Sequence, residues 1–265
     1  MHVFDKTIIV TGAGSGIGKE LTLQLLRKHA RVVGVDINGD ALVETQKLAN
    51  ADDQRFKIYV LDIANMSSVQ SFSKQIGESL GAVDGIINNA GIIQKFVPVN
   101  NLTIEEINRI MNVNFYGMVY MTKAFLPLLL LRSEAHIVNV SSMAGFIPFP
   151  KQTVYGAAKA AVKIFTEGLY AELKDTQVKV TVVHPGAVQT AITENSGLGK
   201  PKAIQGSSKV TLSASKAAQI IITAIEKNRY RVTVGKDAAM LDLMYRLYPK
   251  GATNFISRMM KRAQV

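Results

Sequence analysis

The feature that most limits the fold of this 265-residue sequence is a regular alternation of short β-branched runs with longer helical segments. The runs are continuously hydrophobic, as expected of parallel strands covered on both faces. They occupy residues 6–12, 31–37, 56–63, 84–91, 135–142, 178–186 and 230–235. Strand–helix alternation favours a doubly wound sheet with right-handed crossovers. We therefore predict an α/β fold in a single domain, residues 1–265.

Two segments depart from this alternation. Residues 187–212 are rich in Gly, Ser and Lys and follow a strand end, which predicts a lid over the substrate. A helix is expected again over 213–228, with Ser213 as its N-cap. The tail 236–265 is basic and rich in Met, and its apolar pairs have helical spacing. It is interpreted as a core or subunit-contact helix, with peripheral attachment to a membrane surface as the alternative.

Composition excludes several kinds of site. The absence of cysteine rules out disulfides, thiolate catalysis and thiolate metal sites. The four histidines have no metal-ligand spacing, so no metal is expected: His2, His29, His136 and His184. The longest apolar run, 125–131, is far shorter than the roughly 20 residues of a membrane span. A cytoplasmic protein is the expectation.

Charge is unevenly distributed along the chain. Residues 195–265 hold 13 of the 31 Lys and Arg but only 3 of the 20 Asp and Glu. This excess is interpreted either as a solvated surface or as a field that attracts anionic partners, such as an acyl carrier or a membrane face. Nucleic acid is not expected, because no basic motif with interleaved aromatic residues accompanies the charge.

A glycine-rich turn, "VTGAGSGIGKE", directly follows the first predicted strand and opens a helix. In this context backbone N–H groups and a helix N-terminus can hold a pyrophosphate. The spacing is T-G-x-x-x-G-x-G, and the residues expected to contact a dinucleotide here are Gly12, Ser15, Gly16, Ile17 and Gly18. The second strand ends at Asp36, whose carboxylate can accept hydrogen bonds from ribose hydroxyls and repels a 2′-phosphate. We therefore predict NAD rather than NADP, with Lys19 as the one basic residue that could weaken this preference.

Seven motifs in order make the sequence resemble the short-chain dehydrogenase/reductase family in its single-domain form, from residue 7 to about residue 235. They are "TGAGSGIG" (11–18), "LDI" (61–63), "NNAG" (88–91), "MNVNFYG" (111–117), "VNVSS" (138–142), "YGAAK" (155–159) and "HPGAV" (184–188). The resemblance implies a Rossmann-like, seven-stranded parallel sheet of order 3-2-1-4-5-6-7 with helices on both faces.

The same resemblance implies a role for each matching residue. Tyr155 would be the general acid/base and Lys159 its activator, one helical turn away. Both would also contact the bound cofactor, Lys159 through the nicotinamide ribose. Ser142 would bind the substrate oxygen, in preference to its neighbour Ser141, and Asn114 would hold a water on the proton path. The remaining cofactor contacts would be Asp62, Ile63, Asn89, Val188 and Thr190.

These residue types fit hydride-transfer chemistry. The pKa of free tyrosine, about 10, is too high for an efficient base at neutral pH. A nearby ammonium, together with the positive charge of an oxidised nicotinamide, is expected to lower it. We predict reversible hydride transfer between NAD(H) and a secondary alcohol/ketone pair. The alternatives are an NADPH-dependent reductase of 3-oxoacyl thioesters and a non-catalytic dinucleotide sensor.

The surroundings of the motifs predict the substrate class and the assembly. Most residues near the catalytic serine and the "NNAG" turn are apolar, which suggests a lipophilic substrate: Ile93, Gln94, Phe96, Met143, Phe146, Ile147, Phe149 and His184. The helix expected over 153–173 carries five alanines, which allow close helix–helix approach. Because family members commonly pair through this helix and the preceding long one, we predict a homotetramer, or otherwise a homodimer.

Overall fold

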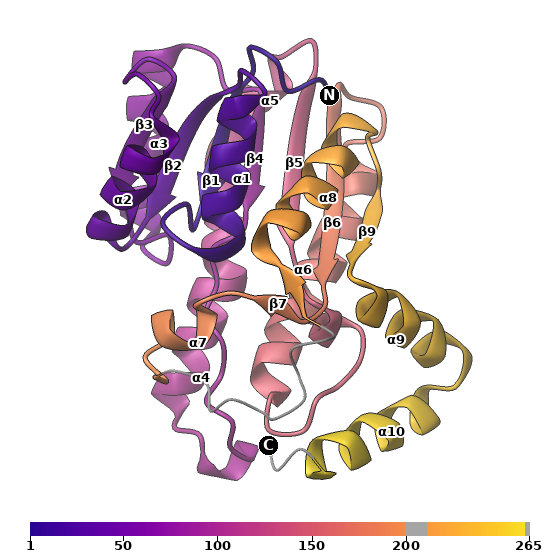
Figure 1. The fold of residues 1–265 in the computed structure, drawn as a ribbon. Coiled ribbons are helices and arrows are strands. Elements are labelled where there is room, and N and C mark those ends of the chain that lie inside the picture. Colours follow the sequence, from indigo (N-terminus) through magenta and orange to yellow (C-terminus); the bar gives the residue numbers. More distant parts are fainter. Residues whose placement is uncertain (200–210, 263–265) are drawn as a thin grey trace.

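The computed structural model describes residues 1–199 and 211–262. Its main sheet has seven parallel strands in the order β3-β2-β1-β4-β5-β6-β9 (Figure 1). The strands are β1 (Thr7–Thr11), β2 (Arg31–Asp36), β3 (Phe56–Val60), β4 (Gly85–Asn88), β5 (Ala135–Val140), β6 (Val178–Pro185) and β9 (Arg231–Val234). Each lies within a predicted run, and β9 is the seventh of them. The predicted fold class and strand order are therefore confirmed.

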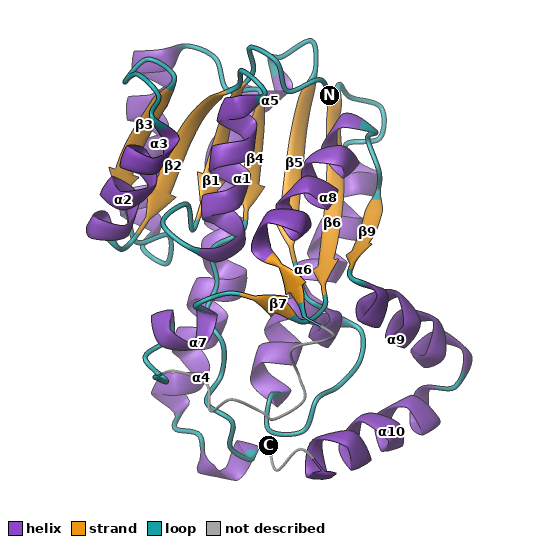
Figure 2. Ribbon diagram, in the orientation of Figure 1, coloured by secondary structure: helices purple, strands orange, loops and turns teal. Residues whose placement is uncertain are grey.

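Helices cover both faces of the sheet (Figure 2). One hydrophobic core joins the sheet to α1 (Gly16–Arg27), α2 (Gly39–Ala49) and α8 (Ala214–Glu226). A second core, on the opposite face, contains α3 (Met66–Leu80), α5 (Gly117–Leu130) and α6 (Thr153–Glu172). Adjacent residues of β1 supply both cores, with Ile8 in the first and Ile9 in the second. This explains why the strands are hydrophobic without alternation.

One helical stretch, Ile104–Leu130, is long and apolar enough to cross a membrane by length and composition. It consists of α4 (Ile104–Met111), a π-helical turn (Asn112–Tyr116) and α5. Met121, Phe125 and Leu129 of α5 are fully buried in the second core. The α5 part of the stretch therefore serves as a core helix of the doubly wound fold.

The carboxyl ends of the strands face a group of smaller elements (Figure 1). These include the 3₁₀ turns Val99–Asn101 and Met143–Gly145, the short strands β7 (Val188–Gln189) and β8 (Leu212–Ser213), and α7 (Ile192–Asn195). β7 and β8 pair in parallel, so the two ends of the predicted lid 187–212 lie together. Residues 200–210 of that lid lie outside the described residues. As predicted, the Ser213 side chain caps α8, accepting the Lys216 N–H at 3.2 Å.

The tail after β9 forms two helices, α9 (Lys236–Leu247) and α10 (Pro249–Arg262). Leu241, Ala252, Ile256 and Met260 pack with Ile147 in a third, smaller core. The tail thereby contacts the loop that follows β5, next to the carboxyl edge of the sheet.

Candidate active site

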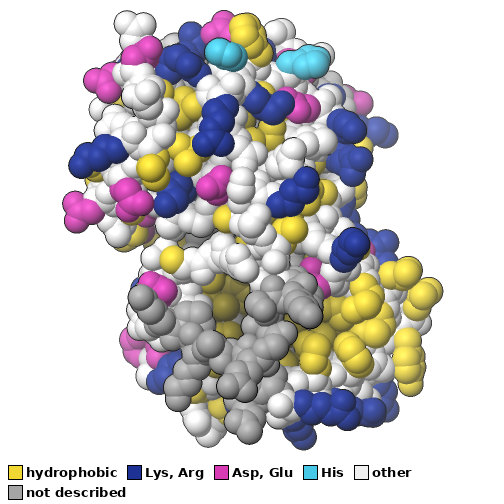
Figure 3. Space-filling model, in the orientation of Figure 1, with side chains coloured by type: hydrophobic (Ala, Val, Ile, Leu, Met, Phe, Trp, Pro, Cys, Tyr) yellow, Lys and Arg dark blue, Asp and Glu magenta, His cyan; other side chains and the backbone are white. Residues whose placement is uncertain are grey.

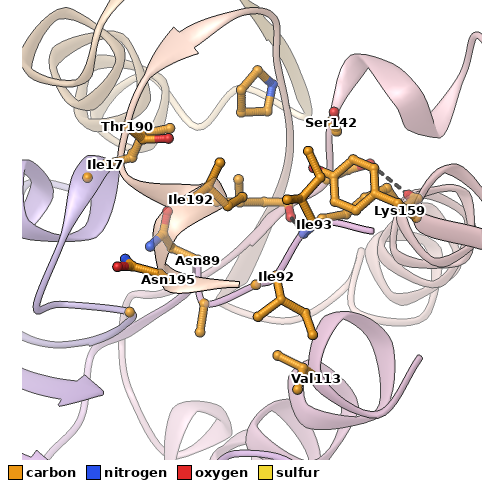
Figure 4. Close-up of a pocket in the computed structure, with 18 of the residues that line it drawn as sticks. Ile17, Asn89, Ile92, Ile93, Val113, Ser142, Lys159, Thr190, Ile192 and Asn195 are labelled. Atoms are coloured by element: carbon orange, nitrogen blue, oxygen red, sulfur yellow. Dashed lines mark hydrogen bonds between the residues drawn. The ribbon is translucent and has the colours of Figure 1, made fainter. Parts of the chain in front are cut away.

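A cavity of about 960 Å³ opens at the carboxyl edge of the sheet. It is lined by the turns after β1, β2, β3, β4, β5 and β6, and by parts of α4, α6, α7 and α10. In open α/β sheets this edge is where ligands bind. Figure 4 shows Thr190 and Asn195 close to Ile17 on one side of the cavity, with Ser142 and Lys159 on the other. The predicted cofactor and catalytic residues, except Gly18 and Asn114, thus converge on one space.

The glycine-rich turn has the backbone shape that its sequence suggests. Gly12 and Gly16 have φ of 71° and 51°, a region that favours glycine. A Cβ at Gly12 would lie 2.9 Å from the Asn89 side chain, and a Cβ at Gly18 would collide with the Gly12 carbonyl. Gly12, Ser15, Gly16 and Ile17 line the cavity, whereas Gly18 does not and instead allows the helix to approach the strand.

Asn89 and Thr11 hold this turn against the end of β4. The Asn89 side chain donates to the Thr11 carbonyl at 3.0 Å. The Thr11 hydroxyl accepts the N–H groups of Asn89 and Ala90, both at 3.0 Å. Asn89 lines the cavity as predicted, and its side chain also braces the glycine turn.

Asp36 lies at the end of β2 with its carboxylate fixed by backbone donors. One oxygen accepts the Gly14 N–H at 2.9 Å, and the other accepts the Asn38 N–H at 3.0 Å. Lys19 pairs with Glu44 at 3.5 Å. Each Asp36 oxygen keeps accepting capacity toward the cavity that it lines.

The residues predicted to surround the adenine and the nicotinamide also line the cavity. Asp62 is exposed after β3 and accepts the Ala64 N–H at 2.9 Å, while Ile63 is buried beside it. Val188 and Thr190 line the side formed by the turn after β6. The Thr190 side chain would be 3.2 Å from a Cβ at Gly16, so this segment crosses to the glycine turn.

Two side-chain contacts tie α7 and the residue after it to opposite walls of the cavity. Asn195 donates to the Ser15 hydroxyl at 2.7 Å, and Ser196 accepts the Ile93 N–H at 2.9 Å. The described part of the predicted lid therefore spans from the glycine turn to the loop after β4.

Ser141 and Ser142 point in different directions. Ser141 is buried, and its hydroxyl donates to the Lys159 carbonyl at 2.7 Å inside α6. The Ser142 hydroxyl accepts the Ala144 N–H at 3.1 Å, and its own hydrogen can be donated to Tyr155 or to a substrate oxygen. The geometry thus agrees with the preference for Ser142 as the residue that meets a substrate oxygen.

Tyr155 and Lys159 lie one turn apart near the start of α6, as the spacing predicts, and both line the cavity. The Lys159 ammonium is 5.9 Å from the centroid of the Tyr155 ring. It donates to the Val140 carbonyl at 3.0 Å, which anchors it to the end of β5.

In the protein without cofactor, burial determines the protonation of Tyr155 and Lys159. It raises the pKa of Tyr155 above its usual value, against a smaller opposing effect of hydrogen bonding with Ser142. It lowers the pKa of Lys159 to about 8. In the protein without cofactor, desolvation disfavours both charged forms and outweighs any effect of Lys159 on the pKa of Tyr155. The lowered pKa was expected beside an oxidised nicotinamide, and for that complex it stays a prediction. Tyr155 is held protonated at neutral pH, ready to donate.

Asn114 lies in the π-helical turn, buried behind the cavity and not in its lining. Its amide group donates to the carbonyls of Ile92 and Ile110, and its oxygen accepts the Ile92 N–H at 3.1 Å. The side chain thus supports the loop after β4. Its role in holding a water stays a prediction.

The structure reassigns half of the predicted substrate-pocket residues. Ile93, Phe96, Met143 and Phe149 line the cavity, whereas Gln94, Phe146, Ile147 and His184 do not. The residues behind the cavity wall contact other parts of the protein instead. His184 is fully buried, with Nδ1 3.1 Å from the Ser142 carbonyl, and burial lowers its pKa to about 4.

Gln94 has a structural role that the sequence did not suggest. Its side-chain oxygen accepts the N–H groups of Val154 and Tyr155, at 2.9 and 3.1 Å. The N-cap residue of α6, Gln152, makes no such bond with its side chain. Gln94 therefore caps the helix that carries Tyr155 from a distant part of the sequence. Met260 of α10 was missed as well, although it lines the cavity.

Comparison with known proteins identifies the family. The profile of the family described as "short chain dehydrogenase" matches residues 6–200. The chain belongs to the short-chain dehydrogenase family. It is 37% identical over 250 residues to a putative oxidoreductase, SadH, of Mycobacterium tuberculosis, a match that covers 91% of this chain and 90% of that protein.

Solved structures of other short-chain dehydrogenases agree. One from Burkholderia phymatum, in complex with NAD, has a TM-score of 0.79 and 25% identity, and the match covers 88% of this chain and 90% of that one. Another, from Burkholderia cenocepacia in complex with NADP, also has a TM-score of 0.79 and 25% identity, with coverage of 97% and 99%. This short-chain dehydrogenase is accordingly an oxidoreductase with a nucleotide-binding fold.

Proposed function

We propose that this enzyme transfers hydride reversibly between NAD(H) and a lipophilic secondary alcohol/ketone pair, with Tyr155 as the general acid/base. One observation carries the proposal: Tyr155, Lys159 and Ser142 line the same cavity as the glycine turn and Asp36. A proton donor and a dinucleotide cradle in one space provide what a carbonyl reduction needs.

The residues at this edge fit a nicotinamide dinucleotide. The Ser15 side chain, at the N-cap of α1, makes no capping bond, and a Cβ at Gly12 would lie 2.9 Å from Asn89 and 3.0 Å from Ala90. Gly12, Ser15, Gly16 and Ile17 would hold the pyrophosphate, Asp36 the adenosine ribose, and Asp62 and Ile63 the adenine. Asn89, Val188 and Thr190 would line the nicotinamide side. When bound, the nicotinamide supplies the hydride acceptor or donor.

Three side chains handle the proton and the charge on the substrate oxygen. The Tyr155 hydroxyl, protonated through burial, donates its proton to the carbonyl oxygen in reduction and takes it back in oxidation. Ser142 donates its hydroxyl hydrogen to the same oxygen and stabilises the charge that develops there. Lys159 is held at the end of β5 by the Val140 carbonyl, where its ammonium can favour the phenolate and bind the nicotinamide ribose.

The preference for NAD rests on Asp36. Its carboxylate is fixed by two backbone donors and faces the cavity, so a 2′-phosphate there would meet a negative charge. Lys19, which could neutralise that phosphate, is paired with Glu44. A higher kcat/KM with NADPH than with NADH for the same substrate would contradict this preference.

The lining beside Ser142 and Tyr155 supports a lipophilic substrate. The apolar side chains there come from the loop after β4, from the π-helical turn before α5, from the loop after β5 and from α10: Ile92, Ile93, Phe96, Val113, Met143, Phe149 and Met260. Apolar walls with a few convergent polar groups are typical of sites for small lipophilic ligands.

A substrate panel followed by NADH absorbance tests the proposal. It should contain lipophilic secondary alcohols, hydroxysteroids and 3-hydroxyacyl thioesters, each with NAD and with NADP. We expect turnover of lipophilic alcohols with NAD. Turnover confined to thioesters with NADP would instead favour the 3-oxoacyl thioester reductase.

The assembly is proposed to be a homotetramer or a homodimer built on α5 and α6. Large apolar side chains are exposed along these helices, among them Leu130 and Ile164. Pairing of this face would bury them. Light scattering that gives a monomer at micromolar concentration would contradict this assembly.

A further inference from the structure

The outer face of α9 is apolar, although it points away from the protein. Met240, Leu243 and Leu247 follow one another at helical spacing and are 57%, 60% and 77% exposed. A solvent-facing helix surface is normally polar. Tyr248, which follows directly, is also exposed. An exposed apolar stripe of this kind indicates a contact surface.

Helix α10 extends this stripe and adds positive charge. Phe255 and Met259 are exposed along one flank of the helix. The face opposite its buried side carries the exposed basic residues Lys250, Arg258, Lys261 and Arg262. Figure 3 shows the apolar patch at the side of the molecule, with a row of Lys and Arg along its lower edge. We call these outer surfaces of α9 and α10 the tail face.

Both carboxylates of residues 236–262 have partners in the rest of the protein. Asp237 accepts the Ala187 N–H at 2.7 Å. Asp242 makes a two-point ion pair with Arg231 of β9, at 2.7 and 2.8 Å, and this guanidinium lowers the pKa of Asp242. The charge that the tail face offers to a partner is therefore basic.

The positive charge of the tail face indicates which kind of partner it binds. A two-fold contact between copies of the tail face would bring the basic residues of both α10 helices together, which is unfavourable. A solvated surface needs no exposed Leu, Met and Phe. An apolar stripe beside Lys and Arg complements an anionic lipid surface, where apolar side chains enter the headgroup boundary and basic ones contact lipid phosphates.

Helix α10 also forms part of the cavity wall. On the inner side of α10, Ile256 packs with Ile147, and Met260 lines the cavity. Met143 and Phe149, which also line the cavity, pack against this small core. A surface bound at the tail face would thus lie one helix away from the substrate.

We infer that the tail face docks on anionic bilayers and brings the cavity to the lipid phase in which its substrate dissolves. The inference rests on the proposed function for the substrate class, but the docking surface is independent of catalysis. Each basic residue near an anionic surface strengthens binding roughly five-fold at moderate salt. Removing three of them should therefore weaken binding roughly a hundred-fold.

Sedimentation with vesicles tests the docking. The full-length enzyme is mixed with vesicles of phosphatidylcholine alone or of phosphatidylcholine with phosphatidylserine. We expect it to sediment with the anionic vesicles only, and less so at high salt. The variants Leu243→Gln/Leu247→Gln and Arg258→Gln/Lys261→Gln/Arg262→Gln should each lose at least ten-fold in binding. A matched control on α2, Lys47→Gln/Leu48→Gln, changes one exposed basic and one exposed apolar residue and should bind as the parent does.

Activity toward a water-soluble secondary alcohol, measured without vesicles, separates the two proposals. The tail-face variants should keep the parent kcat and KM, because they leave the cavity unaltered. Loss of vesicle binding with this activity retained supports docking. Vesicle binding without activity on any alcohol or ketone would contradict the proposed function and leave docking intact. Docking would be overturned if the enzyme bound no vesicles or bound neutral vesicles equally well. It would also be overturned if the Leu243→Gln/Leu247→Gln variant were monomeric where the parent is an oligomer.

Discussion

Replacing Gln94 by leucine tests how the catalytic helix is held in place. The Gln94 side chain is fully buried and makes four hydrogen bonds. Its oxygen accepts from Val154 and Tyr155, and its nitrogen donates to the carbonyls of Lys151 and Val97 at 2.9 and 3.4 Å. Leucine has a similar volume and replaces none of these bonds.

The expected loss of stability follows from these bonds. Removing a helix cap costs about 0.5–2 kcal/mol, and each buried group left without a partner adds about 1–3 kcal/mol. Because local relaxation and water recover part of this, we expect a loss of about 2–4 kcal/mol for Gln94→Leu. For a domain of this size, that corresponds to a fall of roughly 5–15 °C in Tm.

Activity should fall more than the affinity for cofactor. Tyr155 lies in the capped first turn, and a misplacement of about 1 Å can cost roughly 100-fold in rate. We expect kcat to drop at least ten-fold while the KM for NADH changes little, since Asp36 and the glycine turn are distant in the sequence and independently braced.

Two further variants make this experiment decisive. Gln94→Glu keeps an acceptor for both N–H groups but adds negative charge beside Tyr155. It loses the bonds donated to the Lys151 and Val97 carbonyls, so the protein should stay less stable than the parent. The pH profile of alcohol oxidation should move to higher pH, because the added charge raises the pKa of Tyr155. Gln70→Leu, at an exposed position of α3, is the matched control and should resemble the parent. Parent-like Tm and kcat in Gln94→Leu would refute the capping role.

Three other perturbations have distinct expected outcomes. Ser142→Ala should lower kcat roughly 10²–10³-fold, whereas Ser141→Ala should mainly lower Tm; the reverse pattern would exchange their roles. Asp36→Ala should move the NADH/NADPH ratio of kcat/KM at least ten-fold toward NADPH, and an unchanged ratio would contradict its contact with ribose. The free energy of unfolding in urea should fall by about 4 kcal/mol from pH 7 to pH 5, because burial lowers the pKa of His136 to about 3 and of His184 to about 4. The unfolded chain binds protons below about pH 6.5 that the native protein excludes, so a flat profile over this interval would contradict their burial.

The sheet and the dinucleotide turn could be predicted because their signals are local. A strand covered on both faces is apolar at nearly every position, and the runs that form β1, β2 and β4 show this continuity, whereas β9 alternates. The glycine turn is encoded within eight residues, and Asp36 directly ends a strand. The glycine turn and Asp36 accordingly lie at the carboxyl edge of the sheet, as predicted from the sequence.

The errors concern contacts between distant segments. Gln94 was expected to meet substrate, but its oxygen finds two N–H donors about 60 residues later in the chain. Met260 reaches the cavity only because α10 folds back on the loop after β5. No periodicity within either segment indicates these pairings. The extent to which Tyr155 is buried, which raises its pKa in the protein without cofactor, likewise depends on the whole fold.

The most direct test of the central claim is Tyr155→Phe. The substitution removes the hydroxyl and keeps the ring, and Tyr170→Phe on the same helix is the matched control. With a substrate from the panel, Tyr155→Phe should lose at least roughly 10³-fold in kcat. NADH affinity, measured by fluorescence titration, should stay within about two-fold of the parent, because no cofactor contact proposed above depends on this hydroxyl's proton. Substantial residual kcat in Tyr155→Phe would contradict the assignment of Tyr155 as the general acid/base.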